Sequence, residues 1–166
     1  MYCLHYFTSN GFSDILLQSD GEVLTGLSFL KSEKGIKTSH RGTEAKDLPI
    51  FRETTRYLDL YFQGEVPDFL PRYRLDGATP FRLAIADLLS RIPYGETVTY
   101  GDLAKEVARL RGKEKMSAQA VGGAVGWNPV SILIPCHRVI GADGSLVGYG
   151  GGIENKRLLL ALERRR

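Results

Sequence analysis

Cysteine is scarce in this chain, and so is histidine. The 166 residues include two cysteines, Cys3 and Cys136, and three histidines. Two cysteines do not suggest a disulfide framework, and a reactive thiol requires a reducing compartment. Cys3, His5 and His40 offer three soft ligands, but neither their spacing nor a fourth ligand indicates a tetrahedral metal site. We therefore expect a cytoplasmic protein without a bound metal.

The chain also lacks long hydrophobic runs. No stretch approaches the roughly 20 apolar residues that a membrane span needs, and the first residues do not form a signal peptide. Hydrophobic residues still make up 43% of the chain, which is enough to bury a sizeable core in one domain or two small ones. The composition predicts a globular protein that does not enter a membrane.

A strong excess of one charge is absent as well, because the formal net charge is +3. The two halves differ, however. Residues 1–76 carry 9 Lys and Arg against 11 Asp and Glu, whereas residues 77–166 carry 13 against 8. The basic second half fits a polyanionic partner such as DNA, but it equally fits an ordinary solvated surface.

The first half has the pattern of a small antiparallel sheet with one helix. Apolar and polar residues alternate over residues 12–30 around Asp20-Gly21, which predicts a hairpin because glycine supplies the positive φ of a tight turn. Residues 2–8 predict a further strand, and residues 31–46 a polar, flexible connection.

A helix is expected next, because apolar residues recur at helical spacing from Leu48 to Phe62 and Gly64 can end it. Residues 65–78 then read as the passage to a second domain, so we expect domains over 1–76 and 77–166.

The second half is predicted to be mainly helical. Capping residues followed by periodic apolar positions mark each helix start. The expected helices run from Thr79-Pro80 to about Arg91, from Thr99 to about Leu110, from Ser117 to about Gly126, and from Asn155 to Glu163. Two short helices joined by a turn indicate a helix-turn-helix, a motif that binds DNA but also occurs in purely structural packing. The fold class expected for the whole chain is α+β.

The most informative segment is Pro135-Cys136-His137-Arg138, which follows the apolar, strand-like run Ile132-Leu133-Ile134. Proline restricts the backbone before the cysteine, and the next residue offers an imidazole that could take the thiol proton directly or through a water. A cysteine in such a place is more often an inert core residue. The surrounding sequence favours a nucleophile.

Ordered blocks around this segment resemble the O6-alkylguanine-DNA alkyltransferases. The blocks are Phe81, Ile92-Pro93-Tyr94-Gly95, Tyr100, Asn128-Pro129, Ile132 to Gly141, Gly148 to Gly152, and Lys156 to Leu159. The first half is similar to the family only in length and strand pattern. The resemblance implies a ribonuclease H-like sheet domain over 1–76 and a winged-helix-like domain over 77–166.

The resemblance also implies an activity. A family member transfers the alkyl group of O6-alkylguanine in double-stranded DNA irreversibly to its own cysteine, here Cys136, after flipping the nucleotide out of the stack. O4-alkylthymine is a further possible substrate. No cofactor is implied, and a monomer is expected. A lesion sensor without transfer and a Cys-His hydrolase are the alternatives, and the presence of Cys136 argues against the sensor.

Residue roles follow from the same resemblance. His137 corresponds to the base that acts through a water, and Glu163 to the carboxylate that orients it. Asn128 corresponds to the asparagine that ties the preceding turn to the active-site loop. Tyr100 corresponds to the tyrosine that helps rotate the nucleotide and donates to the leaving guanine.

The remaining implied residues contact substrate or DNA. They are Gln119, Ala120, Gly123, Trp127, Arg138, Tyr149, Gly150 and Gly151. Tyr149 and the glycines are expected in the wall of the base pocket. Gln119 departs from the family, which usually has an intercalating arginine there, and the basic connection from Arg109 to Lys115 is longer.

Overall fold

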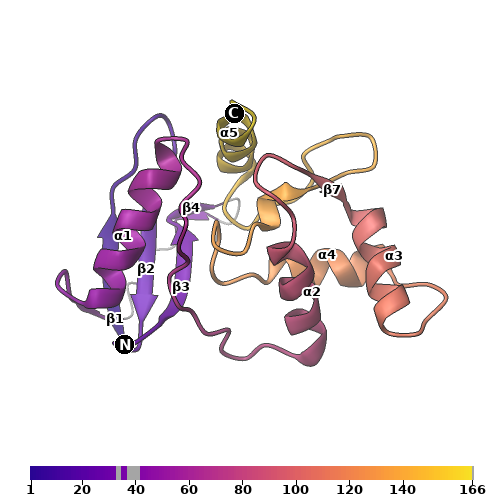
Figure 1. Cartoon of the computed structure of the whole chain (residues 1–166), viewed down its shortest axis with the longest axis horizontal. Coiled ribbons are helices and arrows are strands. Elements are labelled where there is room, and N and C mark those ends of the chain that lie inside the picture. Colours follow the sequence, from indigo (N-terminus) through magenta and orange to yellow (C-terminus); the bar gives the residue numbers. More distant parts are fainter. Residues whose placement is uncertain (33–34, 37–41, 166) are drawn as a thin grey trace.

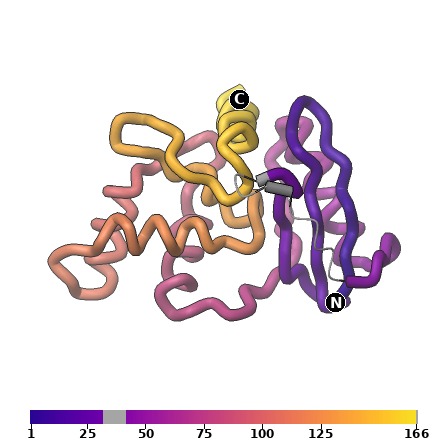
Figure 2. Tube along the Cα trace, turned by 180° about the vertical axis from the view of Figure 1, so that it is seen from behind, coloured from indigo at the N-terminus to yellow at the C-terminus, as the bar shows by residue number. Residues whose placement is uncertain are grey.

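The chain folds into a sheet-containing half and a mainly helical half (Figure 1). The computed structural model describes residues 1–32, 35–36 and 42–165. The last helix, α5 (Ile153–Glu163), lies over the junction between the halves, as the view from behind also shows (Figure 2). This arrangement confirms the α+β fold.

The sheet has the strand order β3-β2-β1-β6. β1 (Tyr2–Tyr6), β2 (Ile15–Ser19) and β3 (Leu24–Phe29) pair antiparallel, and Gly21 takes a φ of 113° in the predicted hairpin turn.

The prediction of an antiparallel sheet followed by an unstructured connection was wrong in part. β6 (Thr43–Glu44) pairs parallel with β1, and β4 (Lys31–Ser32) pairs with β5 (Gly35–Ile36). β6 supplies partners for the free backbone edge of β1, because Thr43 N–H donates to the Met1 carbonyl over 3.1 Å. The expectation for residues 33–34 and 37–41, which include His40, lies outside the described residues.

The predicted helices are confirmed to within two residues at their ends. They are α1 (Pro49–Phe62), α2 (Pro80–Ser90), α3 (Tyr100–Leu110), α4 (Ala118–Gly126) and α5. The Thr79, Thr99 and Ser117 side chains accept hydrogen bonds from the backbone of the first turns of α2, α3 and α4. None of the described helices is long and apolar enough to cross a membrane.

The outer edge of β3 joins the two halves. Leu27 N–H donates to the Pro129 carbonyl, and Ser131 N–H donates to the Leu27 carbonyl, both over 2.9 Å. The segment before Cys136 therefore extends the sheet like a further strand.

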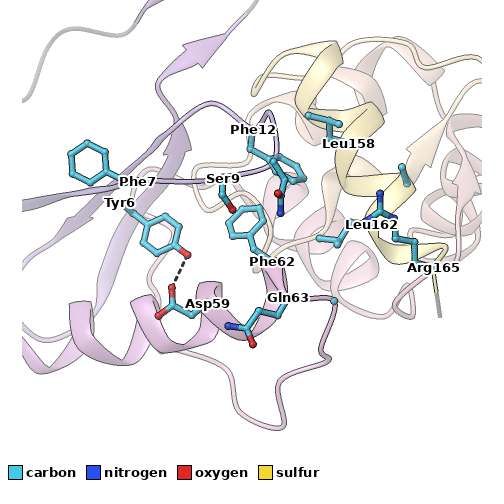
Figure 3. A pocket seen from close by; sticks show the side chains of 13 residues that line it. Tyr6, Phe7, Ser9, Phe12, Asp59, Phe62, Gln63, Leu158, Leu162 and Arg165 are labelled. Atoms are coloured by element: carbon cyan, nitrogen blue, oxygen red, sulfur yellow. Dashed lines mark hydrogen bonds between the residues drawn. The ribbon is translucent and has the colours of Figure 1, made fainter.

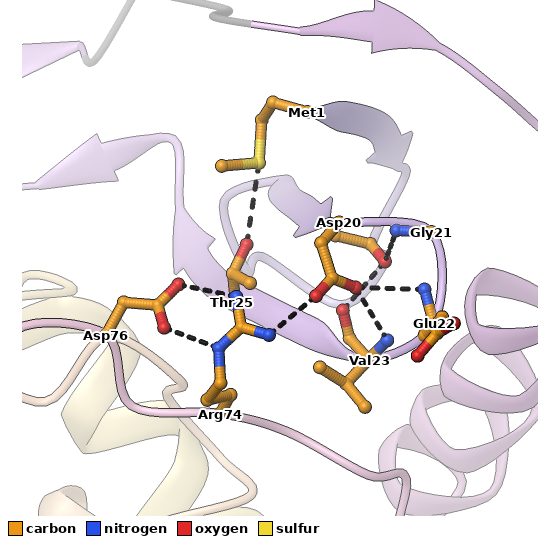
Figure 4. A network of polar contacts seen from close by, with 9 residues as sticks. Met1, Asp20, Gly21, Glu22, Val23, Thr25, Arg74 and Asp76 are labelled. Atoms are coloured by element: carbon orange, nitrogen blue, oxygen red, sulfur yellow. Dashed lines mark hydrogen bonds and ion pairs between the residues drawn. The ribbon is translucent and has the colours of Figure 1, made fainter.

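The connecting segment is held against the sheet as well. Arg74 N–H donates to the Leu24 carbonyl over 2.8 Å, and Leu24 N–H donates to the Arg72 carbonyl over 3.0 Å. The Arg74 guanidinium contacts Asp20 over 2.7 Å (Figure 4). Asp20 in turn accepts from the backbone N–H groups of Glu22 and Val23 in the hairpin turn. The passage between the halves is thus fixed to the hairpin by side-chain and backbone contacts.

The apolar run before Cys136 is a tight buried turn, which corrects the strand-like interpretation. Ile132 has a φ of 71°, in the left-handed region that a β-branched residue rarely adopts. Ser131 and Ile134 bridge across the turn, and the side chains of residues 132–134 are all buried. Burial of the run was predictable from its hydrophobicity, whereas the reversal of the chain was not.

Leu27 offers a test of the joined core. It is 0% exposed, so Leu27→Ala should lower the free energy of unfolding by about 2–5 kcal/mol through the cavity that it leaves. Leu83→Ala is the matched control, because Leu83 is 49% exposed and its loss should cost less than about 0.5 kcal/mol. Chemical denaturation measures both values, and equal losses would contradict the packing described.

Candidate active site

Cys136 begins a 3-10 turn, η1 (Cys136–Arg138), directly after Pro135. Its side chain is buried, and the Asn128 amide nitrogen donates to Sγ over 3.1 Å. The same nitrogen donates to the Ile134 carbonyl over 2.8 Å, while the Asn128 amide oxygen accepts from Val130 N–H over 3.0 Å. Asn128 therefore holds both ends of the turn and directs a donor at the sulfur.

Burial raises the pKa of the Cys136 thiol, although the Asn128 hydrogen bond and the Lys156 ammonium act in the opposite direction. The thiol is therefore mostly protonated at neutral pH and needs a base before it can act as a nucleophile.

Lys156 is a charged residue that the sequence alone did not single out. It is fully buried on α5, and its ammonium donates to the carbonyls of Val139 and Val147 over 2.6 and 3.2 Å. It shares a face of α5 with buried Leu160 and Glu163, at helical spacing. That spacing was the signal for a lysine turned inward.

Glu163 is buried and accepts five hydrogen bonds. Its Oε1 accepts from the Tyr61 hydroxyl over 2.6 Å, from His137 Nε2 over 2.7 Å and from Arg138 Nη2 over 2.9 Å. Its Oε2 accepts from Arg138 Nε over 2.9 Å and from Gly95 N–H over 3.1 Å. Burial acts to raise the pKa of the carboxyl, but the bonds from His137 and Arg138 outweigh it and hold the pKa well below the usual range.

His137 is fully buried, and burial lowers the pKa of its imidazole despite the neighbouring Glu163. An ionised carboxylate can only accept, so the neutral ring must carry its proton on Nε2. Nδ1 is then an acceptor, and it is buried with no hydrogen-bond partner among the described residues. A free basic nitrogen thus belongs to the residue next to Cys136.

A pocket of about 490 Å³ opens over Cys136, with walls from both halves of the chain. Its lining includes Tyr100, Trp127, Asn128, Tyr149, Gly150 and Gly151, which were predicted, and Gln18, Thr25, Gly26 and Ser28 of the sheet, which were not. A Cβ on Gly151 would lie 2.7 Å from the rings of Phe29 and Tyr149, so only glycine fits there.

The family described as 6-O-methylguanine DNA methyltransferase, DNA binding domain, matches residues 80–165. The chain belongs to this family.

Individual relatives agree over nearly the whole chain. A methylated-DNA--protein-cysteine methyltransferase of Methanosarcina acetivorans is 43% identical over 149 residues, which is 90% of either chain. That of Haemophilus influenzae is 42% identical over 150 residues, 90% of this chain and 80% of its own. The structure of Mycobacterium tuberculosis OGT in complex with DNA superposes with a TM-score of 0.81 at 37% identity, covering 99% of this chain and 94% of the other.

Within this methyltransferase family member, Arg138 is placed differently from what we expected. It was predicted as a substrate or DNA contact, but its side chain is buried, bonded to Glu163 and to the Ile92 carbonyl over 2.6 Å. Its guanidinium also lies over the Tyr94 ring. The pairing with a buried carboxylate makes Arg138 a partner of Glu163 inside the fold.

The outer face of α4 is exposed and small-sided. Gln119, Ala120 and Gly123 lie on it, whereas Val121 and Ala124 face the core. A Cβ on neighbouring Gly122 would lie 4.0 Å from the Tyr100 ring, so this helix borders the pocket over Cys136. Trp127, at the end of α4, is half-buried under the Arg82 guanidinium, 4.7 Å from its ring centre.

A larger hollow of about 650 Å³ lies elsewhere, between β1, α1 and α5 (Figure 3). Phe12, Phe62 and Leu162 line it, and Tyr6 donates to Asp59 over 2.8 Å at its side. None of the residues that surround Cys136 lines this hollow, so the chemistry and not the pocket size identifies the site.

No group of His, Cys, Asp or Glu among the described residues could hold a metal ion. Of the three soft ligands considered above, the Cys3 thiol donates to the Gly42 carbonyl and His5 pairs with Asp14 over 2.9 Å. His40 lies outside the described residues.

Glu163 should make stability depend on acidity. Its pKa is lower in the folded protein than in the unfolded chain, so its stabilisation is complete above about pH 4.3 and is lost as the pH falls further. Glu163→Gln removes this titration, and we expect the free energy of unfolding to vary less with pH between about pH 5 and 3. Urea denaturation at a series of pH values measures the slope.

Glu154→Gln is the control, because Glu154 is an exposed carboxylate on the same helix, paired with Arg157. The wild-type slope should persist in it. The role given to the buried carboxylate is refuted if both variants keep the same slope.

Proposed function

We propose that this protein repairs double-stranded DNA by moving the alkyl group of O6-alkylguanine irreversibly onto Cys136, one group per protein molecule. The observation that carries the proposal is the joining of a buried thiol, an acceptor nitrogen on the adjacent His137 and an ionised Glu163 beneath an open pocket. Family membership supplies the substrate class. No cofactor takes part.

The first step of the proposed reaction is proton removal from the thiol. His137 Nδ1 accepts the proton through a bridging water, and Glu163 offsets the positive charge that the ring gains. Asn128 and Lys156 stabilise the thiolate, in agreement with their lowering effect on the pKa of Cys136. Thiolate is thereby formed when the substrate arrives, while the resting thiol stays protonated.

The second step is a direct displacement. Sγ forms a bond to the alkyl carbon as the bond from that carbon to O6 breaks, and the electron pair leaves with the guanine. The guanine takes a proton from a donor, a role for which we propose the Tyr100 hydroxyl at the pocket rim, and the proton held by His137 then restores this hydroxyl through water. The C–S bond of the thioether is stable in water, so the alkyl group stays on Cys136 and the protein is consumed.

The target base must leave the stack to reach Cys136, at a cost of a few kcal/mol. We propose that the small outer face of α4 at Ala120 and Gly123 enters the minor groove and that Gln119 fills the space of the flipped base. The flipped base would lie against Tyr149, Gly150 and Gly151, with Trp127 supporting the end of the helix.

The proposal extends to the fold type of each half of the chain. Residues 1–76 form a ribonuclease H-like structural domain, and residues 77–166 a winged-helix-like domain whose helix-turn-helix, α3 and α4, binds DNA. The protein acts as a monomer in the cytoplasm. The caps of α3 and α4 support the helix-turn-helix, and the excess of basic residues in the second half supports its binding to DNA.

Cys136→Ser should abolish methyl transfer and retain affinity for DNA, because a serine hydroxyl fits the site but is a far weaker nucleophile near neutral pH. The measurement mixes protein with duplex DNA containing O6-methylguanine and reads the protein mass. One added methyl on Cys136 of the unmodified protein supports repair, whereas binding without transfer indicates a sensor and repeated turnover indicates a hydrolase. Cys3→Ser is the control and should still accept one methyl.

Substitution of Gln119 tests how the protein keeps the target nucleotide out of the stack without the arginine that the family usually has at this position. Arg109 is exposed in the last turn of α3, where it pairs with Glu106, and Arg111, Lys113 and Lys115 are exposed in the connection that follows. We expect their phosphate contacts to compensate, so Gln119→Arg should change the single-turnover rate little. Neutralising all four should weaken duplex binding about tenfold or more at low salt.

Single strands need no unpairing, so they serve as the matched substrate in the same experiment. A large gain from the arginine on duplex DNA alone, without any loss on neutralisation, would contradict compensation.

A further inference from the structure

We propose that Tyr61 is a positioning residue for alkyl transfer: its hydroxyl, carried by α1 of the first half, holds Glu163 in the place and charge balance that His137 needs. The inference rests on the proposed function. It assigns a part in the chemistry to a half of the chain that lies outside the family match to residues 80–165.

The geometry of Tyr61 leaves it little freedom. The residue is buried near the end of α1, and its hydroxyl lies 2.6 Å from Glu163 Oε1 and 3.4 Å from His137 Nε2. The rings of Phe62 and Tyr94 pack edge-on against it at centroid distances of 5.6 and 6.0 Å. The packed Tyr61 ring therefore holds its hydroxyl against Glu163 Oε1.

This hydroxyl is a permanent donor. Burial and the nearby Glu163 raise the pKa of Tyr61 well above its ordinary value, so it stays protonated throughout the working pH range. A hydrogen bond to an ionised acceptor is stronger than one between neutral groups. Because Tyr61 always donates to Oε1, part of the negative charge on this oxygen is neutralised, and Oε1 attracts the His137 ring less strongly.

Loss of the Tyr61 hydroxyl would change the pKa of His137 in a predictable direction. Three charged groups surround the imidazole, Glu163 and Lys156 from α5 and Arg138 from η1, and the adjacent Cys136 thiol is protonated. The other ionisable neighbours are Tyr61 and Tyr57 of α1 and Tyr94, with pKa values of the two α1 hydroxyls raised by burial. Without the Tyr61 hydroxyl, Oε1 would attract the imidazolium more strongly and raise the pKa of His137.

Tyr61→Phe tests the proposal, because it keeps the packed ring and removes only the hydroxyl. We expect the single-turnover rate of methyl transfer to fall about tenfold, since Glu163 is no longer held where it orients the His137 ring, and this loss of position outweighs the higher basicity of the ring. The acid limb of the plot of rate against pH should also move to higher pH, while DNA affinity stays unchanged.

Tyr6→Phe is the matched control. It removes the same kind of bond, from a tyrosine hydroxyl to the carboxylate of Asp59 on the same helix, but at the hollow away from Cys136 (Figure 3). Its rate and pH profile should equal those of the wild type. Melting temperatures of both variants show whether a lower rate merely follows lower stability.

A double-mutant cycle with Glu163→Gln decides whether Tyr61 acts through the carboxylate. In that background Tyr61→Phe should add no further loss of rate. The inference is overturned if wild type transfers methyl but Tyr61→Phe keeps its rate and pH profile, or if the two losses simply add. Failure of the wild type to transfer methyl would instead refute the proposed function itself.

Discussion

The ionised, buried carboxylate of Glu163 is the interaction on which the rest of the site depends. A buried charge is costly unless it is paired and hydrogen-bonded, so its donors must all reach the same point. They come from α1, from the loop at Gly95 and from η1, three segments far apart in the sequence. Satisfying one anion therefore fixes the position of His137 and of the turn that carries Cys136.

The sheet also helps to position the chain before Cys136. Its outer strand β3 binds the backbone before Cys136, and its residues Thr25 and Ser28 reach the wall of the pocket. The helical half contributes Cys136, His137 and Glu163, and the sheet half contributes part of the pocket wall and the Tyr61 hydroxyl. Both halves therefore line the pocket over Cys136.

The sequence predicted what depends on local signals. Caps such as Thr99 and Ser117 and the Asp-Gly turn lie within short windows, and the structure agrees with them. Features set by distant contacts were missed. β6 has two residues, too few for an alternation of apolar and polar positions to show. The Arg138 side chain points inward because it pairs with Glu163, and the Tyr61 hydroxyl donates to Glu163, which lies 102 positions away in the sequence. Such pairings depend on tertiary packing, which no window contains.

Pairing of β3 with the chain at residues 129–131 has a consequence for solubility. A strand at the edge of a sheet presents unpaired backbone groups that can template association with another molecule. Here β6 covers the edge at β1, and the segment before Cys136 helps cover the edge at β3. Displacement of this segment would expose the backbone of β3, so the hydrogen bonds that hold the chain before Cys136 also protect the sheet from association with another molecule.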